Sequence, residues 1–194
     1  MRVLVLSQNS SPILDIIKEM GDEVVEYRDT IDIRFLEKYK IDMIVSHGYR
    51  HLLKQPVLGY FPDRIINLHI SLLPWNRGAD PNLWSYLENT PRGVTIHFID
   101  KGVDTGDIIS QKEVYFSIEN ETLATSYMRL QDEILMLFEK TWPLIRTGKN
   151  KRIQQPKGGT LHKSIDKNRF EHLLIKGWDT PVLLISGKGL SNQE

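Results

Sequence analysis

Short strand-like runs recur along the first third of the chain. They lie at residues 3–6, 23–27, 43–45 and 65–70. The segments that separate the first three runs carry apolar residues at helical spacing instead, at residues 12–20 and 31–39. Ser10 or Ser11 is expected to cap the first of these helices, because a serine hydroxyl can accept a hydrogen bond from a free N–H group of a first helical turn.

This alternation of strands and helices predicts the fold class. It is typical of an α/β protein with a Rossmann-like, mostly parallel sheet and flanking helices. Further along, the pattern predicts a helix at residues 81–87 and strands at residues 93–99 and 108–116. A long amphipathic helix follows, which Asn120 is expected to cap and Pro143 to kink or end.

Length and regularity predict the domain organisation. The chain has 194 residues, an ordinary size for one domain. The pattern becomes less regular from residue 153 onward. We therefore expect a single domain over residues 1–194, in which residues 153–194 form an irregular C-terminal extension.

Composition and charge exclude several classes of function. The formal net charge is zero, so a nucleic-acid partner is not expected. The absence of cysteine excludes disulfides, thiolate nucleophiles and cysteine-ligated metals, and no metal site is expected. The chain starts directly on a strand without a signal peptide, and no apolar run is long enough to span a bilayer. These features predict a cytoplasmic protein that has no membrane partner.

Three polar side chains stand out as candidate catalytic groups. Asn67 and His69 lie two residues apart on a predicted strand, so both point to the same face of the sheet. Asp104 lies in a glycine-flanked loop that can fold back onto this face. Ligands of such sheets bind at the carboxyl ends of the strands. An amide and an imidazole at one strand end can then reach the same reacting atom.

The stretch around these residues resembles the folate-dependent formyltransferases. The resemblance rests on Asn67-x-His69, the Ser-Leu-Leu-Pro turn at residues 71–74, Arg77-Gly78 and the Asp-Thr-Gly-Asp loop that begins at Asp104, all in the family's order. It implies transfer of a formyl group from 10-formyltetrahydrofolate to a primary amine. Asn67 and His69 would then stabilise the oxyanion. Asp104 would keep His69 protonated and relay the amine proton through a water molecule.

The resemblance also implies two sets of binding residues. The folate would contact Tyr49, Arg50, His51, Leu52, Leu53, Lys101, Gly102, Val103 and Asp107. The acceptor would contact Ser7, Asn9, Ser10, Arg77 and His97. Structural roles stay open for Arg77 in the turn, for Asp107 in the loop and for His97 on its strand. The serines of residues 7–11 precede a helix and can cap it without any ligand.

Three branches of this family differ in the amine that they formylate. Residues 81–84, Pro-Asn-Leu-Trp, resemble the branch that formylates the amino group of a nucleotide-linked amino sugar. The glycine-free loop of residues 7–12 counts against a glycinamide ribonucleotide enzyme. Too few residues follow Gly148 for the RNA-binding domain of a methionyl-tRNA enzyme. A 10-formyltetrahydrofolate hydrolase and a non-catalytic folate-binding relative also stay open, as does a homodimer. A dinucleotide enzyme would need a G-x-G-x-x-G motif, which is absent.

Overall fold

The computed structural model describes residues 1–190, and their contacts group into two compact units. The first unit comprises Met1–His69, Ile96–Ser110 and Leu135–Gln154. The second comprises Ile70–Thr95, Gln111–Ile134 and the chain from Gln155 onward. The single-domain organisation stays a prediction.

A six-stranded sheet in the order β2-β1-β3-β4-β6-β7 organises the fold. Its strands are β1 (Arg2–Ser7), β2 (Glu23–Tyr27), β3 (Met43–His47), β4 (Ile65–His69), β6 (Gly93–Phe98) and β7 (Ile108–Glu113). β1 runs parallel to β2 and β3, and β3 runs parallel to β4. The predicted mostly parallel α/β sheet is thereby confirmed. β7 ends three residues before the predicted Phe116.

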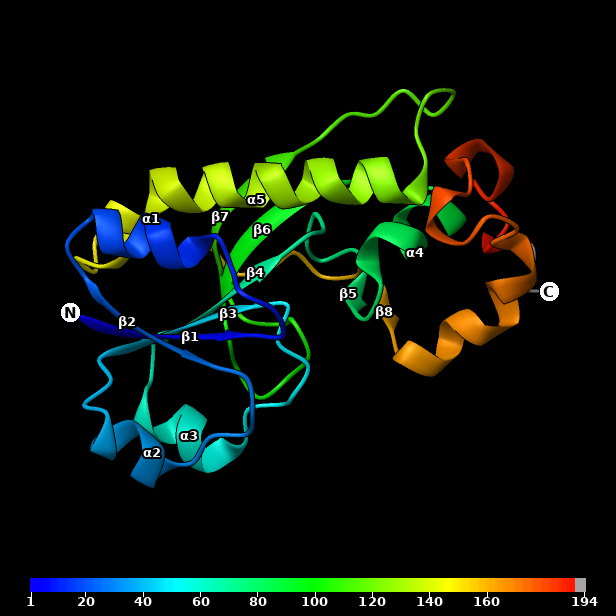
Figure 1. The fold of residues 1–194 in the computed structure, drawn as a ribbon. Coiled ribbons are helices and arrows are strands. Elements are labelled where there is room, and N and C mark those ends of the chain that lie inside the picture. Colours follow the sequence, from blue (N-terminus) through cyan, green and yellow to red (C-terminus); the bar gives the residue numbers. More distant parts are fainter. Residues whose placement is uncertain (191–194) are drawn as a thin grey trace. The chain divides into compact units, whose positions relative to one another are not determined.

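Helices cover both faces of this sheet within the first unit. α1 (Ile13–Glu19) lies on one face, and α2 (Ile33–Lys38) and α3 (Gln55–Tyr60) lie on the other (Figure 1). The core on the α2 and α3 side consists of buried apolar side chains from three strands and both helices: Leu4, Leu6, Leu36, Ile44, Val57, Phe61 and Ile65 among them. Alternate residues of each strand reach this core because successive side chains point to opposite faces.

Two predicted helix caps are wrong. The residue that precedes α1 is Pro12, which makes no side-chain capping bond, and Ser11 instead hydrogen-bonds to His47. The long helix α5 (Leu123–Ile145) does not start at Asn120. The hydroxyl of Thr122 accepts the Thr125 N–H at 3.1 Å in its place. α5 also continues past Pro143, so this proline does not end the helix.

Among residues 1–190, none of the helices combines the length and the apolar composition that a membrane span requires.

The second unit is built from short elements around a core of its own. It contains β5 (Arg77–Gly78), α4 (Pro81–Leu87), β8 (Leu161–His162) and the 3-10 helices η1 (Ser164–Leu173), η2 (Gly177–Asp179) and η3 (Val182–Leu184). The predicted boundaries of α4 are confirmed. The core is made of buried side chains from α4, the start of α5 and the C-terminal segment, namely Leu83, Trp84, Tyr86, Leu87, Leu123, Phe170, Val182 and Ile185.

Asp22 is the centre of a buried polar network in the first unit. Its side chain has no exposed surface and accepts hydrogen bonds from the Arg146 guanidinium, the Met1 amino group and the Trp142 indole, at 2.7 to 3.1 Å. Burial alone would raise the pKa of Asp22, but these donors outweigh it and lower the pKa below 3.8. The network therefore ties α5 to the start of the sheet only while the carboxylate is charged.

Replacing this carboxylate should destabilise the first unit. We expect Asp22→Asn to lower the free energy of unfolding at neutral pH by roughly 3 kcal/mol, because the buried acceptor loses its charge while Arg146 keeps its own. The folded-state pKa is lowered, so the contribution is complete above the ordinary value of 3.8 and is lost as the pH falls further. Urea titrations of both proteins at several pH values measure this. A difference between the two proteins that persists at low pH would contradict the assignment.

Candidate active site

Two strands and one loop of the first unit bring four polar side chains together. β4 presents Asn67 and His69 on one face, and β6 contributes His97. Asp104 lies in the loop after β6 and has a positive φ of 51°. Such a backbone conformation is uncommon for a residue other than glycine and often marks a functional loop. The loop is held by Asp100, which accepts the Gly102 N–H and a Thr105 hydroxyl hydrogen bond.

The Asp104 carboxylate is the common partner of this cluster. Its Oδ1 lies 3.2 Å from the Asn67 amide nitrogen and 3.4 Å from His97 Nε2. Its Oδ2 lies 3.7 Å from His69 Nδ1. The four residues are largely buried, with His69 7% and His97 1% exposed. Attraction between charges is stronger in such an environment than in water, so burial strengthens the electrostatic effect of Asp104 on its neighbours.

The hydrogen bonds of His97 define its tautomer. Its Nδ1 lies 2.8 Å from the Phe98 carbonyl oxygen, which can only accept, so Nδ1 carries the hydrogen. In the neutral ring Nε2 is then an acceptor, and the Asn67 amide nitrogen lies 3.2 Å away to donate to it. The second Asn67 N–H points to Asp104. Both amide hydrogens therefore have acceptors, so Asn67 can donate to an oxyanion only by exchanging one of these bonds.

The expected contact of His97 with the acceptor stays a prediction, and in the structure its Nε2 lies 3.2 Å from the Asn67 amide nitrogen, where it can orient that amide. We expect His97→Ala to lower kcat about tenfold to a hundredfold and to leave the KM for the folate unchanged. Without His97 the Asn67 amide loses its orientation, and a misplaced group slows the chemical step more than it weakens binding. The exposed His172→Ala is the control. Steady-state kinetics measure the split between kcat and KM. A change in the KM for the acceptor alone, with kcat unchanged, would mean that His97 binds the acceptor and does not position Asn67.

The residues expected to contact the folate lie on two loops of the first unit. The Tyr49 hydroxyl donates to the Asp29 carbonyl, and burial raises the pKa of Tyr49. Leu52 is 78% exposed, and Val103 is also exposed, on the loop that carries Asp104. Exposed apolar side chains of this kind are common at binding sites, and the contact of these loops with the folate stays a prediction.

The remaining members of the same expected set differ in their surroundings. Leu53 packs against the core cluster of α2 and α3. Asp107 accepts a hydrogen bond from Arg152 at 2.6 Å, and the same guanidinium also binds Asp63. The side chains of Arg50, His51 and Lys101 are exposed, as is Gly102. The carboxylate of Asp107 thus has a structural partner of its own.

The residues expected to contact the acceptor are not all in one unit. Ser7 is buried at the end of β1, and Asn9 and Ser10 are exposed in the loop that follows. Arg77 belongs to the second unit, where its guanidinium donates to the Thr160 and Gly158 carbonyls. The structure therefore gives Arg77 partners that hold the turn, and its contact with the acceptor stays a prediction.

Sequence reasoning missed one polar pair at this edge. The hydroxyl of Ser11 lies 2.7 Å from His47 Nδ1. His47 is the last residue of β3, and Ser11 lies in the loop after β1, the parallel neighbour of β3. The sequence offers a partial signal, because the predicted strands at residues 3–6 and 43–45 end shortly before Ser11 and His47. Their pairing depends on β1 and β3 being neighbours, which a single strand pattern does not reveal.

The chain is similar to known formyltransferases. A model of the formyl transferase family matches residues 2–139. The formyltransferase PseJ from Anoxybacillus kamchatkensis, solved in complex with UDP-4,6-dideoxy-4-formamido-L-AltNAc and tetrahydrofolate, is 49% identical with a TM-score of 0.93, and the match covers 97% of this chain and 100% of that chain.

Two further relatives show how far the likeness extends. The methionyl-tRNA formyltransferase of Agathobacter rectalis is 31% identical over 179 residues, which cover 90% of this chain but only 56% of the relative's length. The likely sugar N-formyltransferase Rv3404c from Mycobacterium tuberculosis has a TM-score of 0.75 at 23% identity, covers 87% of this chain and 77% of that chain, and shows a shared fold. Because the family model matches most of the chain, the chain belongs to the formyl transferase family.

Proposed function

We propose that this protein transfers a formyl group from 10-formyltetrahydrofolate to the amino group of a nucleotide-linked amino sugar. The observation that carries the proposal is the buried cluster in which Asp104 contacts Asn67, His69 and His97. The choice of acceptor is supported by the likeness to PseJ, whose complex contains a UDP-linked formamido sugar and whose full length the match covers.

The chain's own residues can perform acyl transfer without a covalent intermediate. When bound, 10-formyltetrahydrofolate would supply the formyl carbon that the amine attacks, and the oxyanion develops in this addition. Its collapse would break the C–N bond to the folate nitrogen, which takes up the proton that the amine loses. Protonated His69 donates to this oxyanion, and Asp104 holds the imidazolium from its other side. Asp104 also accepts the proton of the attacking amine through a water molecule.

Asn67 supplies a second donor during the reaction. Its contact with His97 is long, at 3.2 Å. A hydrogen bond to an oxyanion is shorter and roughly twice as strong. Exchange of the His97 bond for the oxyanion is therefore favourable only when charge develops, so Asn67 stabilises the transition state more than the substrate.

A second function, hydrolysis of the formyl folate, uses the same cluster. Water would take the place of the amine, and Asp104 would remove its proton. The two functions differ in their dependence on an acceptor.

A methionyl-tRNA acceptor is supported by relatives such as the Agathobacter enzyme, of which this chain spans 56% of the length.

An assay of tetrahydrofolate release tests the proposal. The protein is incubated with 10-formyltetrahydrofolate and either no acceptor, a panel of UDP- and dTDP-linked amino sugars, glycinamide ribonucleotide or methionyl-tRNA. We expect release that depends on a nucleotide-linked amino sugar. Release at the same rate without any amine would establish the hydrolase instead.

The proposal includes the organisation of the protein. We propose that residues 1–194 act as one catalytic domain, in the cytoplasm, and that a homodimer is the working form. Light scattering of the purified protein measures the dimer directly. A single mass of one chain at all concentrations would remove the dimer from the proposal and leave the chemistry untouched.

A further inference from the structure

The loop that carries Asp104 is closed at its base, where the chain leaves β6 and enters β7. The Phe98 N–H donates to the Asp107 carbonyl at 2.9 Å, which brings the two ends of the loop together. Gly106 lies against this point, because a Cβ atom there would lie 1.8 Å from the Phe98 carbonyl oxygen. Asp104 comes just before this closed base in the chain, so a shift of the base would also shift Asp104.

The contacts that join Asp104 to the catalytic cluster are longer than strong ionic hydrogen bonds. Its carboxylate oxygens lie 3.2 Å from the Asn67 amide nitrogen, 3.4 Å from His97 Nε2 and 3.7 Å from His69 Nδ1. Charge-assisted hydrogen bonds from nitrogen to oxygen are shorter, at roughly 2.7 to 2.9 Å. The position of this carboxylate therefore also depends on what holds the backbone of its loop.

Arg152 joins the base of the loop to another part of the first unit. Its Nε donates to Asp107 Oδ2 at 2.6 Å, and its Nη1 pairs with Asp63 in the turn before β4. Its guanidinium also lies 4.8 Å from the centroid of the Phe98 ring, at the end of β6. One side chain thus contacts both ends of the loop.

The backbone beside Arg152 is itself fixed on β7. Ile153 exchanges two backbone hydrogen bonds with Ile108, the first residue of β7, at 2.7 and 2.9 Å. Arg152 therefore reaches Asp107 from a segment that is bonded to the residue directly after Asp107. This segment lies beyond residues 2–139, the part of the chain that the family model matches.

The charges of this network are accessible to water, so we expect them to add little to the stability of the fold. The side chain of Arg152 is 51% exposed, and those of Asp63 and Asp107 are 63% and 30% exposed. Exposed ion pairs contribute little to global stability. Reaction rates are more sensitive, since a group displaced by about 1 Å can slow a reaction by roughly a hundredfold. A local contact of this kind can therefore matter for the rate more than for folding.

We propose that Arg152 is a positioning residue of the active site. It holds the base of the loop between Phe98 and Asp107, and it thereby keeps the Asp104 carboxylate within reach of the other three side chains of the cluster. Its effect on the rate rests on the proposed function. Its effect on the loop does not require any turnover.

A double-mutant cycle with Asp104 tests this role. We expect Arg152→Met to lower kcat about tenfold, because methionine keeps an apolar stem beside Phe98 but loses both ionic contacts. In the Asp104→Asn protein the same substitution should lower kcat by less than about twofold, since the carboxylate that Arg152 positions is already gone. A further tenfold loss in that background would overturn the proposal, because independent structural effects multiply. If Arg152→Met does not fold, the milder Arg152→Gln replaces it in the cycle.

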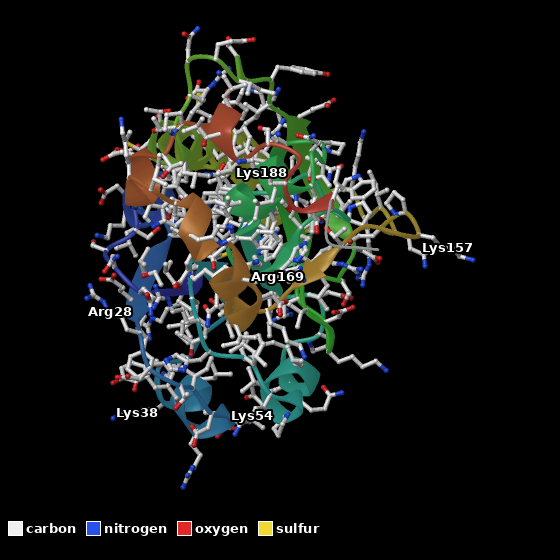
Figure 2. All side chains as sticks on the ribbon, turned by 90° about the vertical axis from the view of Figure 1, so that its right-hand side faces the viewer. Arg28, Lys38, Lys54, Lys157, Arg169 and Lys188 are labelled. Carbon is white, nitrogen blue, oxygen red and sulfur yellow. The ribbon has the colours of Figure 1, made fainter. Side chains whose placement is uncertain are left out.

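Two variants control for the loss of a positive charge. Arg2→Met removes another guanidinium that pairs with a carboxylate, that of Glu23 at 2.6 Å, at the start of β1. Lys38→Gln removes an exposed cation of α2, which Figure 2 labels. Both should keep the wild-type kcat. A tenfold loss in either control would overturn the assignment of the effect to the loop.

Amide hydrogen exchange tests the loop contact without any turnover. The N–H groups of Phe98 and Ile108 are hydrogen-bonded at the base of the loop, so their exchange reports its opening. We expect both to exchange about threefold faster or more in Arg152→Met than in the wild type, and at the wild-type rate in Arg2→Met. Unchanged exchange in Arg152→Met would overturn the proposal.

These results are separable from the proposed function. Faster exchange in Arg152→Met, in a protein whose wild type does not transfer formyl groups, would uphold the loop contact and contradict the reaction. Formyl transfer that is equally fast in Arg152→Met and the wild type would uphold the reaction and overturn the positioning role.

Discussion

His69→Ala should lower kcat by roughly a thousandfold and leave the fold intact. In the proposed mechanism the substitution removes the side chain that donates to the oxyanion, and losses of a hundredfold to ten-thousandfold are usual for such groups. The side chain is 7% exposed, so its removal also opens a small space, but its neighbours are polar and water can enter. Steady-state rates at saturating 10-formyltetrahydrofolate and acceptor measure the effect.

A matched control separates chemistry from stability. His172→Ala removes an exposed imidazole in η1 that no step uses, and its rate should equal that of the wild type. Thermal unfolding of both variants should differ little. A wild-type rate in a folded His69→Ala protein would remove His69 from the mechanism.

Asp104→Asn should lower kcat by about a hundredfold or more while folate affinity stays within a few-fold. An asparagine has the shape of the aspartate but cannot hold the His69 imidazolium by charge or accept the amine proton. The backbone should tolerate the change, since asparagine adopts the positive φ of 51° found at this position without strain. Single-turnover rates and fluorescence titration of the folate measure the two quantities separately.

Asp80→Asn provides the control for this substitution. Asp80 also has a positive φ, of 52°, and its carboxylate pairs with Lys167 at 3.1 Å outside the catalytic cluster. Its replacement should change stability slightly and leave kcat at the wild-type value. Equal rate losses in the two variants would mean that Asp104 acts through loop structure and not through its charge.

The catalytic cluster shows which part of a site local sequence reveals. The two-residue period of β4 places Asn67 and His69 on one face, and the glycines around Asp104 predict its loop. The structure brings Asp104 to both residues. The contact of His97 with Asn67 could not be predicted in the same way, because it depends on β4 and β6 being neighbours in the sheet.

The errors at helix ends have a related cause. Ser11 is a good capping residue, but its hydroxyl is used by His47 across the sheet edge. Asn120 is a good capping residue as well, and the helix begins two residues later because the Thr122 hydroxyl accepts from Thr125. α3 was not predicted, since six residues with a proline and a glycine carry little helical pattern. Tertiary contacts decide between such local alternatives.

The most direct test of formyl transfer follows the carbon itself. The protein is incubated with 10-formyltetrahydrofolate labelled in the formyl carbon and with a UDP-linked amino sugar, and the sugar nucleotide is analysed by mass spectrometry. The account predicts labelled formamide on the sugar with the wild type and none with His69→Ala. Labelled formate as the sole product, with the amino sugar unchanged, would contradict it.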